Sequence, residues 1–119
     1  MDDNQMALTN LTEDETEVVF QCMRWVASGQ VIPHDSEFQT VFGIEPEDVQ
    51  AIVRSLPAIS ESDENVKLAI NNSMNELLTW CDDSDPEWDA HISVTPAELM
   101  RIFRKWRGKP IGNYFVGMA

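Results

Sequence analysis

The chain has 119 residues, of which 43% are hydrophobic and 24% charged, and this composition indicates a folded globular domain, not a disordered or membrane-spanning chain. The length accommodates one domain over residues 1–119, and we expect irregular ends at 1–10 and 111–119. Acidic residues outnumber basic ones by 21 to eight, and the net charge of −13 argues against non-specific nucleic-acid binding, which needs a cationic surface.

The first predicted helix begins at the run Thr12-Glu13-Asp14-Glu15, which has the form of a capping box, and ends near Ser28-Gly29. When this segment is projected at the helical period, its apolar residues cover a wide arc. They are Val18, Val19, Cys22, Met23, Trp25 and Val26. Such a wide apolar face predicts a central helix that its neighbours contact from more than one side.

Two shorter helices are expected next. The run from Asp35 or Ser36 to Gly43 predicts a short helix, with a capping side chain at its start and glycine at its end. The second helix has Pro46 in its first turn and is closed by Pro57. Its apolar residues recur at the helical spacing i, i+3, i+4 and i+7. They are Val49, Ile52, Val53 and Leu56.

The longest predicted helix is capped by Ser62 or Asp63 and ends near Trp80. Its expected core stripe consists of Val66, Ala69, Ile70, Met74, Leu77, Trp80 and Cys81. The opposite face, which we call the amide face, consists of Leu68, Asn71, Asn72, Asn75 and Thr79. Asparagine is a mediocre helix former, and an uncharged ring around an apolar residue is typical of interface centres. This face is either an ordinary polar surface or a contact surface, formed against another segment of the fold or across a homodimer.

After an acidic loop over residues 82–93, the run Thr95-Pro96-Ala97-Glu98 predicts a strong helix start, and this last helix extends to Arg107-Gly108. Its expected core stripe consists of Leu99, Ile102, Phe103 and Trp106. The other face of this helix and the residue just beyond its end carry a basic cluster, formed by Arg101, Arg104, Lys105, Arg107 and Lys109. The cluster is a solvated face that complements the helix dipole and the acidic loop over 82–89, a protein-binding patch, or a nucleic-acid-binding patch.

Four substantial helices and one short helix predict an all-α, single-domain bundle. Residues 44–56 and 94–106 also match at a constant offset, with Pro46 opposite Pro96 and Ile52 opposite Ile102. A duplicated helical pair explains this match. We favour the other explanation, in which two helices independently use one start signal and one apolar stripe.

The run SGQVIPHDSEFQTVFGIEPEDVQAIVRSL, followed by AINNSMNELLTW, resembles a group of small bacterial proteins of unknown function. In that group a glycine-terminated helix leads to an EF…G turn, a helix and an AINNSxNxLL helix. The resemblance covers about residues 20–80 and implies a bacterial cytoplasmic protein, but no activity and no site. The segment WRGKP also resembles the C-terminal end of nuclease-colicin immunity proteins, which are small acidic helical domains, although their central tyrosine-pair motif is absent.

Few residues point to catalysis. His34 and His91 lie in predicted loops, and no nucleophile-and-base arrangement or glycine-rich phosphate loop is recognisable. Cys22 and Cys81 each have an apolar helical context, so we expect two buried thiols in place of a disulfide. These four residues are zinc ligands by type, but no close pair of them is present to nucleate a site. We therefore expect no enzymatic activity, no metal and no cofactor.

The run DDSDPEWDAHIS raises the question of a calcium loop, because acidic residues alternate from Asp83 onward. An EF-hand loop needs glycine at its sixth position and glutamate at its twelfth. Counted from Asp83, these positions hold Trp88 and Val94. We therefore interpret the run as an acidic loop in water.

These observations favour a cytoplasmic protein that acts by binding another protein. The N-terminal sequence is acidic and polar, unlike a secretory leader, and no apolar run reaches the ~18 residues of a membrane span. A net charge of −13 suits a basic partner, as for an inhibitor or immunity-type protein. The amide face and the basic cluster offer docking surfaces for a regulatory adaptor or a homodimer. The alternative is a nucleic-acid-associated regulator that uses the basic C-terminal helix.

Overall fold

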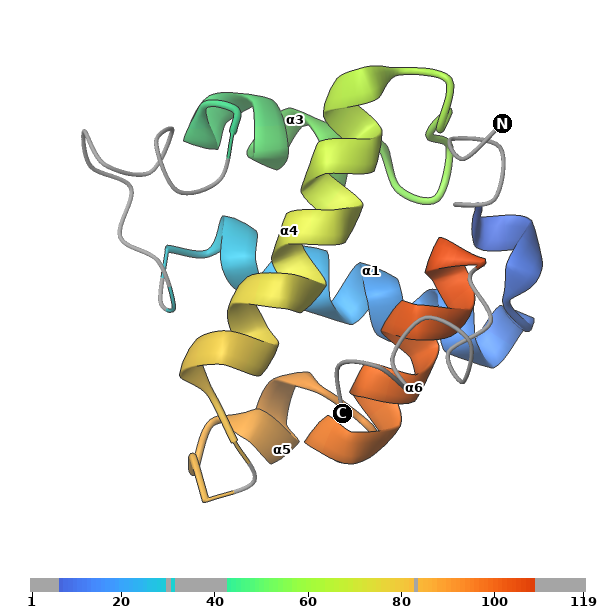
Figure 1. Cartoon of the computed structure of the whole chain (residues 1–119). Helices are drawn as coiled ribbons and strands as arrows, with labels where there is room; N and C mark the ends of the chain where they lie inside the picture. Colours follow the sequence, from blue (N-terminus) through green and yellow to red (C-terminus); the bar gives the residue numbers. More distant parts are fainter. Residues whose placement is uncertain (1–6, 30, 32–42, 83, 109–119) are drawn as a thin grey trace.

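The computed structural model describes residues 7–29, 31, 43–82 and 84–108, and this part of the chain is helical, without a strand. Its elements, shown in Figure 1, are η2 (Leu8–Asn10), α1 (Glu13–Ala27), α3 (Pro46–Ser55), α4 (Glu64–Trp80), α5 (Trp88–His91) and α6 (Pro96–Arg107). The predicted all-α fold with four main helices is confirmed. The short helix expected to end at Gly43 falls outside the described residues. Within the described ranges, no helix combines the length and apolar character needed to cross a membrane.

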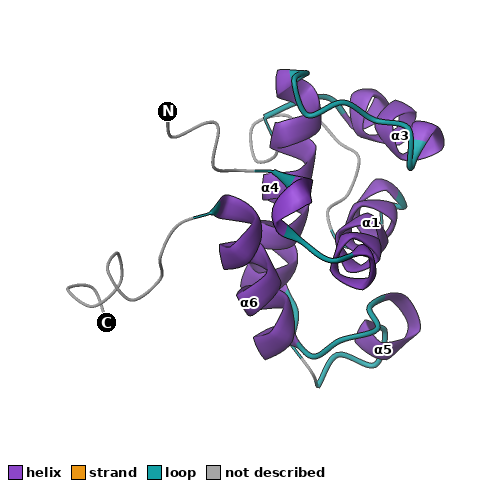
Figure 2. Ribbon diagram, turned by 90° about the vertical axis from the view of Figure 1, so that its right-hand side faces the viewer, coloured by secondary structure: helices purple, strands orange, loops and turns teal. Residues whose placement is uncertain are grey.

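Helix α1 lies at the centre of the molecule. It contacts α3, α4 and α5, while α4 also contacts α3 and α6. Figure 1 shows α4 crossing α1, and Figures 1 and 2 place α3 and α5 at opposite ends of the molecule. All six apolar residues of the wide face predicted for α1 are buried. The sequence-based prediction of a central helix is therefore confirmed.

Side-chain caps confirm the predicted helix starts. The Thr12 hydroxyl accepts a hydrogen bond from the Glu15 N–H (3.2 Å), and the Glu15 carboxylate accepts one from the Thr12 N–H (2.9 Å), which completes the capping box of α1. Asp63 caps α4 and Thr95 caps α6 in the same way, by accepting a backbone N–H. Helix α6 ends at Gly108, whose φ of 74° lies in the left-handed region that glycine tolerates.

The core stripe predicted for α4 is correct as far as Leu77 and wrong beyond it. Trp80, which we expected in the core, is 72% exposed, and Cys81 is only half-buried. Ser73, which the apolar pattern missed, is fully buried. The helical period places Trp80 in line with the stripe, but no neighbouring segment among the described residues covers it.

The acidic loop predicted over 82–93 contains a short helix, α5, that the sequence analysis missed. Its first residue, Trp88, is 1% exposed and meets the Trp25 ring edge to face, with ring centroids 6.0 Å apart. The Trp88 indole N–H donates to the Val94 carbonyl at 2.7 Å, and His91 stacks on Trp25 at 4.7 Å. Burial of one large aromatic side chain therefore holds this acidic segment against α1.

The N-terminal end, expected to be irregular, is partly structured where it is described. The Ala7 N–H and the Asn10 side-chain amide both donate to the Trp106 carbonyl, each at 3.1 Å. Helix η2 therefore lies against the end of α6, where these donors satisfy a backbone carbonyl that the helix itself leaves without an intrahelical partner.

Candidate partner-binding surfaces

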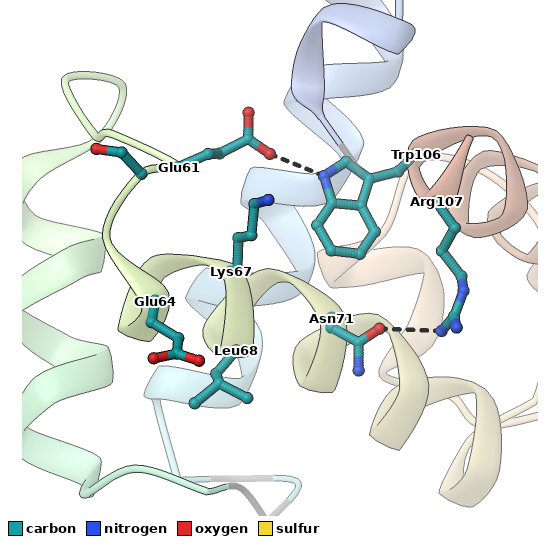
Figure 3. Close-up of a pocket in the computed structure, with 8 residues that line it drawn as sticks. Glu61, Glu64, Lys67, Leu68, Asn71, Trp106 and Arg107 are labelled. Carbon is teal, nitrogen blue, oxygen red and sulfur yellow. Dashed lines mark hydrogen bonds between the residues drawn. The ribbon is translucent and has the colours of Figure 1, made fainter. Parts of the chain in front are cut away.

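The two surfaces predicted on α4 and α6 meet in a groove between these helices (Figure 3). The groove has a volume of about 540 Å³. It is lined by Glu61, Ser62, Glu64, Lys67, Leu68, Asn71, Trp106 and Arg107. Leu68 and Asn71 belong to the predicted amide face, and Arg107 belongs to the basic cluster. The Arg107 guanidinium donates to the Asn71 side-chain oxygen at 3.2 Å, so the two predicted surfaces are joined by a hydrogen bond between helices.

Glu61 holds one side of this groove against α6. Its carboxylate accepts hydrogen bonds from the Trp106 indole N–H at 3.0 Å and from the Leu8 N–H at 2.8 Å. One side chain therefore joins the linker before α4 to both η2 and α6, and Trp106 is fully buried beside it. Glu61 could not be identified from the sequence, because it stands in a polar linker, where no periodicity or capping role distinguishes it from other carboxylates.

The amide face divides into an internal part and an exposed part. Leu68 packs against the core, and an added Cβ on Gly43 would lie 3.8 Å from its methyl groups and 3.6 Å from the Asn72 amide nitrogen. Leu68 and Asn72 therefore lie close to Gly43, in the segment that precedes α3. Asn75 and Thr79 are exposed, and the Thr79 hydroxyl donates within its own helix to the Asn75 carbonyl (2.8 Å). Part of this face thus lies near other segments of the fold, and its role as a partner-binding or homodimer surface stays a prediction.

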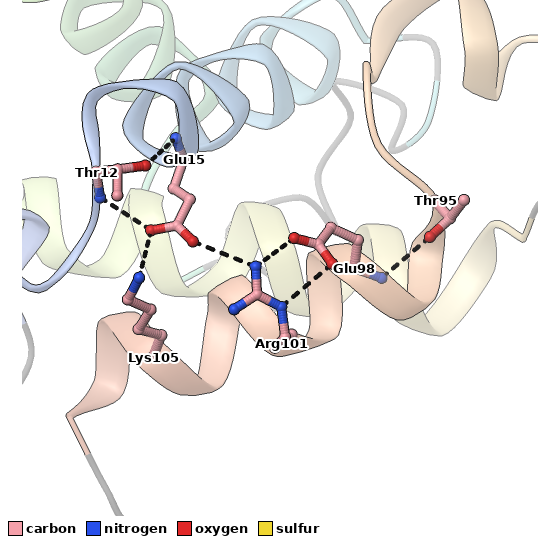
Figure 4. A network of polar contacts seen from close by, with 6 residues as sticks. All are labelled: Thr12, Glu15, Thr95, Glu98, Arg101 and Lys105. Carbon is pink, nitrogen blue, oxygen red and sulfur yellow. Dashed lines mark hydrogen bonds and ion pairs between the residues drawn. The ribbon is translucent and has the colours of Figure 1, made fainter.

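Arg101 and Lys105 of the basic cluster form ion pairs within the molecule (Figure 4). The Lys105 ammonium lies 2.7 Å from one carboxylate oxygen of Glu15, and the Arg101 guanidinium lies 3.3 Å from the other. Arg101 also pairs with Glu98 on its own helix. The hydrogen bond from Lys105 and that from the Thr12 N–H lower the pKa of Glu15 to about 2. An intramolecular attraction therefore exists for Arg101 and Lys105, whose acidic partners are Glu15 and Glu98.

The remaining members of the basic cluster have different surroundings. Arg104 is half-buried. The Arg107 guanidinium lies 5.6 Å from the centre of the Phe103 ring, a cation–π arrangement, in addition to its bond to Asn71. Lys109 lies outside the described residues. The structure thus brings Arg101 and Lys105 together at Glu15 and places Arg107 at the groove, so these three side chains face different surroundings.

A different surface, which the sequence analysis missed, lies where α4 ends, and we call it the acidic end. It consists of Glu76, Trp80, Asp82 and Asp85. The Trp80 indole N–H donates to the Glu76 carboxylate at 2.8 Å. The pKa of the Cys81 thiol is raised by partial burial and then by the charges of Asp85 and Asp82, so these carboxylates lie close to the last turn of α4. Among the described residues, none of the three carboxylates pairs with a lysine or arginine.

The histidines and cysteines considered for catalysis or metal binding can be placed where the structure describes them. No group of three histidine, cysteine or acidic side chains comes together there in a way that would hold a metal ion. His91 stacks on Trp25, and its Nε2 lies 3.5 Å from the Glu87 carboxylate. Cys22 has no exposed surface, and burial raises the pKa of its thiol, which keeps it protonated and inert. His34 lies outside the described part of the chain.

Comparison with known proteins assigns no relative, because no family model, no curated protein and no solved structure matches the chain. Three surfaces are therefore the candidates for binding a partner. They are the groove between α4 and α6, the face of α6 that carries the ion-paired Arg101 and Lys105, and the acidic end.

Proposed function

We propose that this protein is a non-enzymatic interaction module that binds a basic protein partner on its acidic surface, as an inhibitor, an immunity-type protein or a regulatory adaptor does. The observation that supports the proposal is a difference in pairing between the basic and the acidic residues. Arg101 and Lys105 are paired within the molecule with Glu15. In contrast, the stretch 76–91 contains six acidic residues and neither lysine nor arginine. The charge that this stretch offers to a partner is therefore negative.

An acidic surface of this kind has two physical consequences for association. Its field attracts a positively charged partner over several ångströms, which raises the association rate, and it repels phosphate backbones and anionic membranes. Both effects are screened by salt, because the Debye length falls from about 30 Å at 0.01 M to about 8 Å at 0.15 M. Binding that weakens with salt and that selects basic proteins is therefore the expected signature.

The alternative function, a nucleic-acid-associated regulator that uses α6, has weaker support. A phosphate that approaches Arg101 or Lys105 would compete with the carboxylates of Glu15 and Glu98, which already pair with them. It would also approach a molecule with a net charge of −13. This alternative requires binding to duplex DNA or heparin at ~50 mM salt that weakens steeply as salt is added.

The groove between α4 and α6 favours a second mechanism, in which a partner segment docks beside Leu68 as part of a regulatory complex. The groove combines the apolar surface of Leu68 with the polar groups of Asn71 and Arg107, a mixture typical of recognition sites. This mechanism, or a homodimer through the amide face, requires that Leu68→Asp change partner capture or the sedimentation mass. An unchanged mass and unchanged capture would exclude both.

Affinity capture at low salt, with identification by mass spectrometry and repetition with purified components, tests the proposed function. Two variants that remove three carboxylates each provide the comparison. The acidic-end variant is Glu76→Gln, Asp82→Asn, Asp85→Asn, and the α3 variant is Glu45→Gln, Glu47→Gln, Asp48→Asn. The amides preserve hydrogen-bond acceptors, so the charge is the main change.

The expected partner is a basic protein that binds directly and is released by salt. We expect the acidic-end variant to lose it and the α3 variant to retain it. A purified partner that is itself acidic, or binding that does not respond to salt, would contradict the proposed function.

A further inference from the structure

We infer that Trp80 is the anchor residue of the acidic end and binds an arginine-bearing segment of the basic partner. The guanidinium lies over the indole ring and beside the carboxylates of the acidic end. This inference rests on the proposed function, since it names where the basic partner binds and which side chain it uses. It starts from the exposure of Trp80 and from the charge around it.

Trp80 is the tryptophan that the fold leaves in solvent. It is 72% exposed, whereas Trp25, Trp88 and Trp106 are at most 3% exposed. A large aromatic side chain on the surface forgoes the gain that burial provides, and tryptophan is among the residues most enriched at binding hot spots. Because its side chain touches solvent at the end of α4, a partner can reach it without unfolding any part of the core.

The polar atom of Trp80 is already satisfied. Its indole N–H donates to Glu76 one turn earlier on α4, at 2.8 Å. The indole therefore has no donor left for a partner, and what it offers is the electron-rich face of its ring. That face attracts cations, most strongly when the ring is tryptophan.

The end of α4 also lacks the cation that a helix end favours. Arginine or lysine occurs in the last turn of α1, α3 and α6, but not in the last turn of α4. A helix C-terminus carries a partial negative charge, and Asp82 and Asp85 follow directly, so like charges accumulate here. A cation that binds beside Trp80 relieves this repulsion, which supplies the charge complementarity for a basic occupant.

Arginine fits this surface better than lysine does. Its planar guanidinium stacks on an aromatic ring and presents several N–H donors in the same plane to carboxylates. At the acidic end the Glu76 carboxylate is hydrogen-bonded to the edge of the Trp80 ring, and Asp82 follows two residues after Trp80, so one guanidinium can contact a ring and a carboxylate together. A lysine ammonium is a compact, strongly hydrated charge that gains less from the ring.

Binding of two synthetic peptides to the full chain tests the inference. One peptide alternates arginine and glycine, and the other alternates lysine and glycine. Affinity is measured by fluorescence anisotropy of the labelled peptides at ~50 mM salt. Protection of Trp80 is measured in parallel by acrylamide quenching of intrinsic fluorescence. The variants are Trp80→Ala, Trp80→Phe and the two triple variants defined above, each checked for helical content by circular dichroism.

We expect the arginine peptide to bind more tightly than the lysine peptide and to protect Trp80 from the quencher. Trp80→Ala should weaken the arginine peptide by about three- to tenfold and abolish its advantage over lysine, while Trp80→Phe should retain part of both effects. The acidic-end variant should bind at least about tenfold more weakly, and the α3 variant should change binding by no more than about twofold.

Two results would overturn the inference in distinguishable ways. If the arginine peptide binds but Trp80→Ala leaves its affinity unchanged and both triple variants weaken it equally, the anchor is elsewhere and the proposed function stands. If neither peptide binds the wild-type chain at ~50 mM salt, the inference and the proposed function both fail.

Discussion

Two tryptophans near the ends of helices each donate a hydrogen bond to a glutamate, but one is buried and the other is exposed. Trp106, near the end of α6, donates its indole N–H to Glu61 at 3.0 Å, and Trp80, at the end of α4, donates to Glu76 at 2.8 Å. Trp106 has no exposed surface, whereas Trp80 is 72% exposed. The hydrogen bond therefore does not determine burial. What differs is the origin of the acceptor, since Glu61 belongs to a distant segment that covers Trp106 and Glu76 belongs to the same helix as Trp80.

The charges at the same two helix ends differ in a parallel way. Three basic residues, Arg104, Lys105 and Arg107, occupy the last turn of α6, where they complement the helix dipole. The last turn of α4 has no basic residue and is followed by Asp82 and Asp85. One end is thus neutralised and covered by the fold, and the other is left negative and uncovered. This contrast is the physical basis for placing a partner at the acidic end.

The largest expected effect separates the two tryptophans by stability. Trp106→Ala removes a fully buried side chain and should lower the free energy of unfolding by about 3–5 kcal/mol. Trp80→Ala, the matched change at an exposed site, should lower it by no more than about 0.5 kcal/mol. Urea unfolding followed by circular dichroism measures both. A loss at Trp80 comparable with that at Trp106 would show that Trp80 is covered, and the contrast would disappear.

A smaller effect is expected at Glu15, which joins α1 to α6. Glu15→Gln keeps an acceptor for the Thr12 N–H but removes the charge that pairs with Lys105 and Arg101, so the free energy of unfolding at pH 7 should fall by about 0.5–1.5 kcal/mol. Glu17→Gln is the control, because Glu17 pairs with the exposed Arg24 of its own helix; its loss should stay below about 0.5 kcal/mol.

The effect at Glu15 should also depend on pH. Its folded-state pKa, about 2, lies below the ordinary value of 4.5, so its contribution to stability is complete above about pH 4.5 and is lost as the pH falls towards 2. The difference between wild type and Glu15→Gln should therefore shrink over this range in urea unfolding measured at several pH values. A difference that stays constant down to pH 2 would show that the ion pairs do not stabilise the fold.

The smallest effect concerns the missing cation at the end of α4. Thr79→Lys adds a positive charge to the last turn of α4. Thr79→Gln adds no charge, and glutamine has about the same helix propensity as lysine. The lysine variant should be more stable than the glutamine variant by about 0.3–1 kcal/mol at low salt, and the difference should diminish at high salt. Equal stability of the two variants at low salt would indicate that the acidic end has no electrostatic deficit.

Local sequence patterns predicted some residues of the candidate surfaces but not how these residues come together. The sequence identified Leu68, Asn71 and Arg107 as candidates, but it could not show that Arg107 meets the other two in one groove, because α6 and α4 are far apart in the chain. It identified Glu15 as a capping residue but not as the partner of Lys105, for the same reason. The sequence did not identify Glu61, and it placed Trp80 in the core. In both cases the neighbouring residues in the sequence do not show which distant segment, if any, contacts the side chain.

The sequence by itself determined the helices and most of their buried faces. Thr12, Asp63 and Thr95 start helices at the predicted places because a cap needs only a side chain and the next turn of backbone. Apolar stripes follow from the helical period, which is equally local. Only the tertiary structure decided which stripe ends are covered, which cations find carboxylates and which tryptophan stays in solvent. These outcomes depend on contacts between residues distant in sequence, and no periodicity within one segment encodes them.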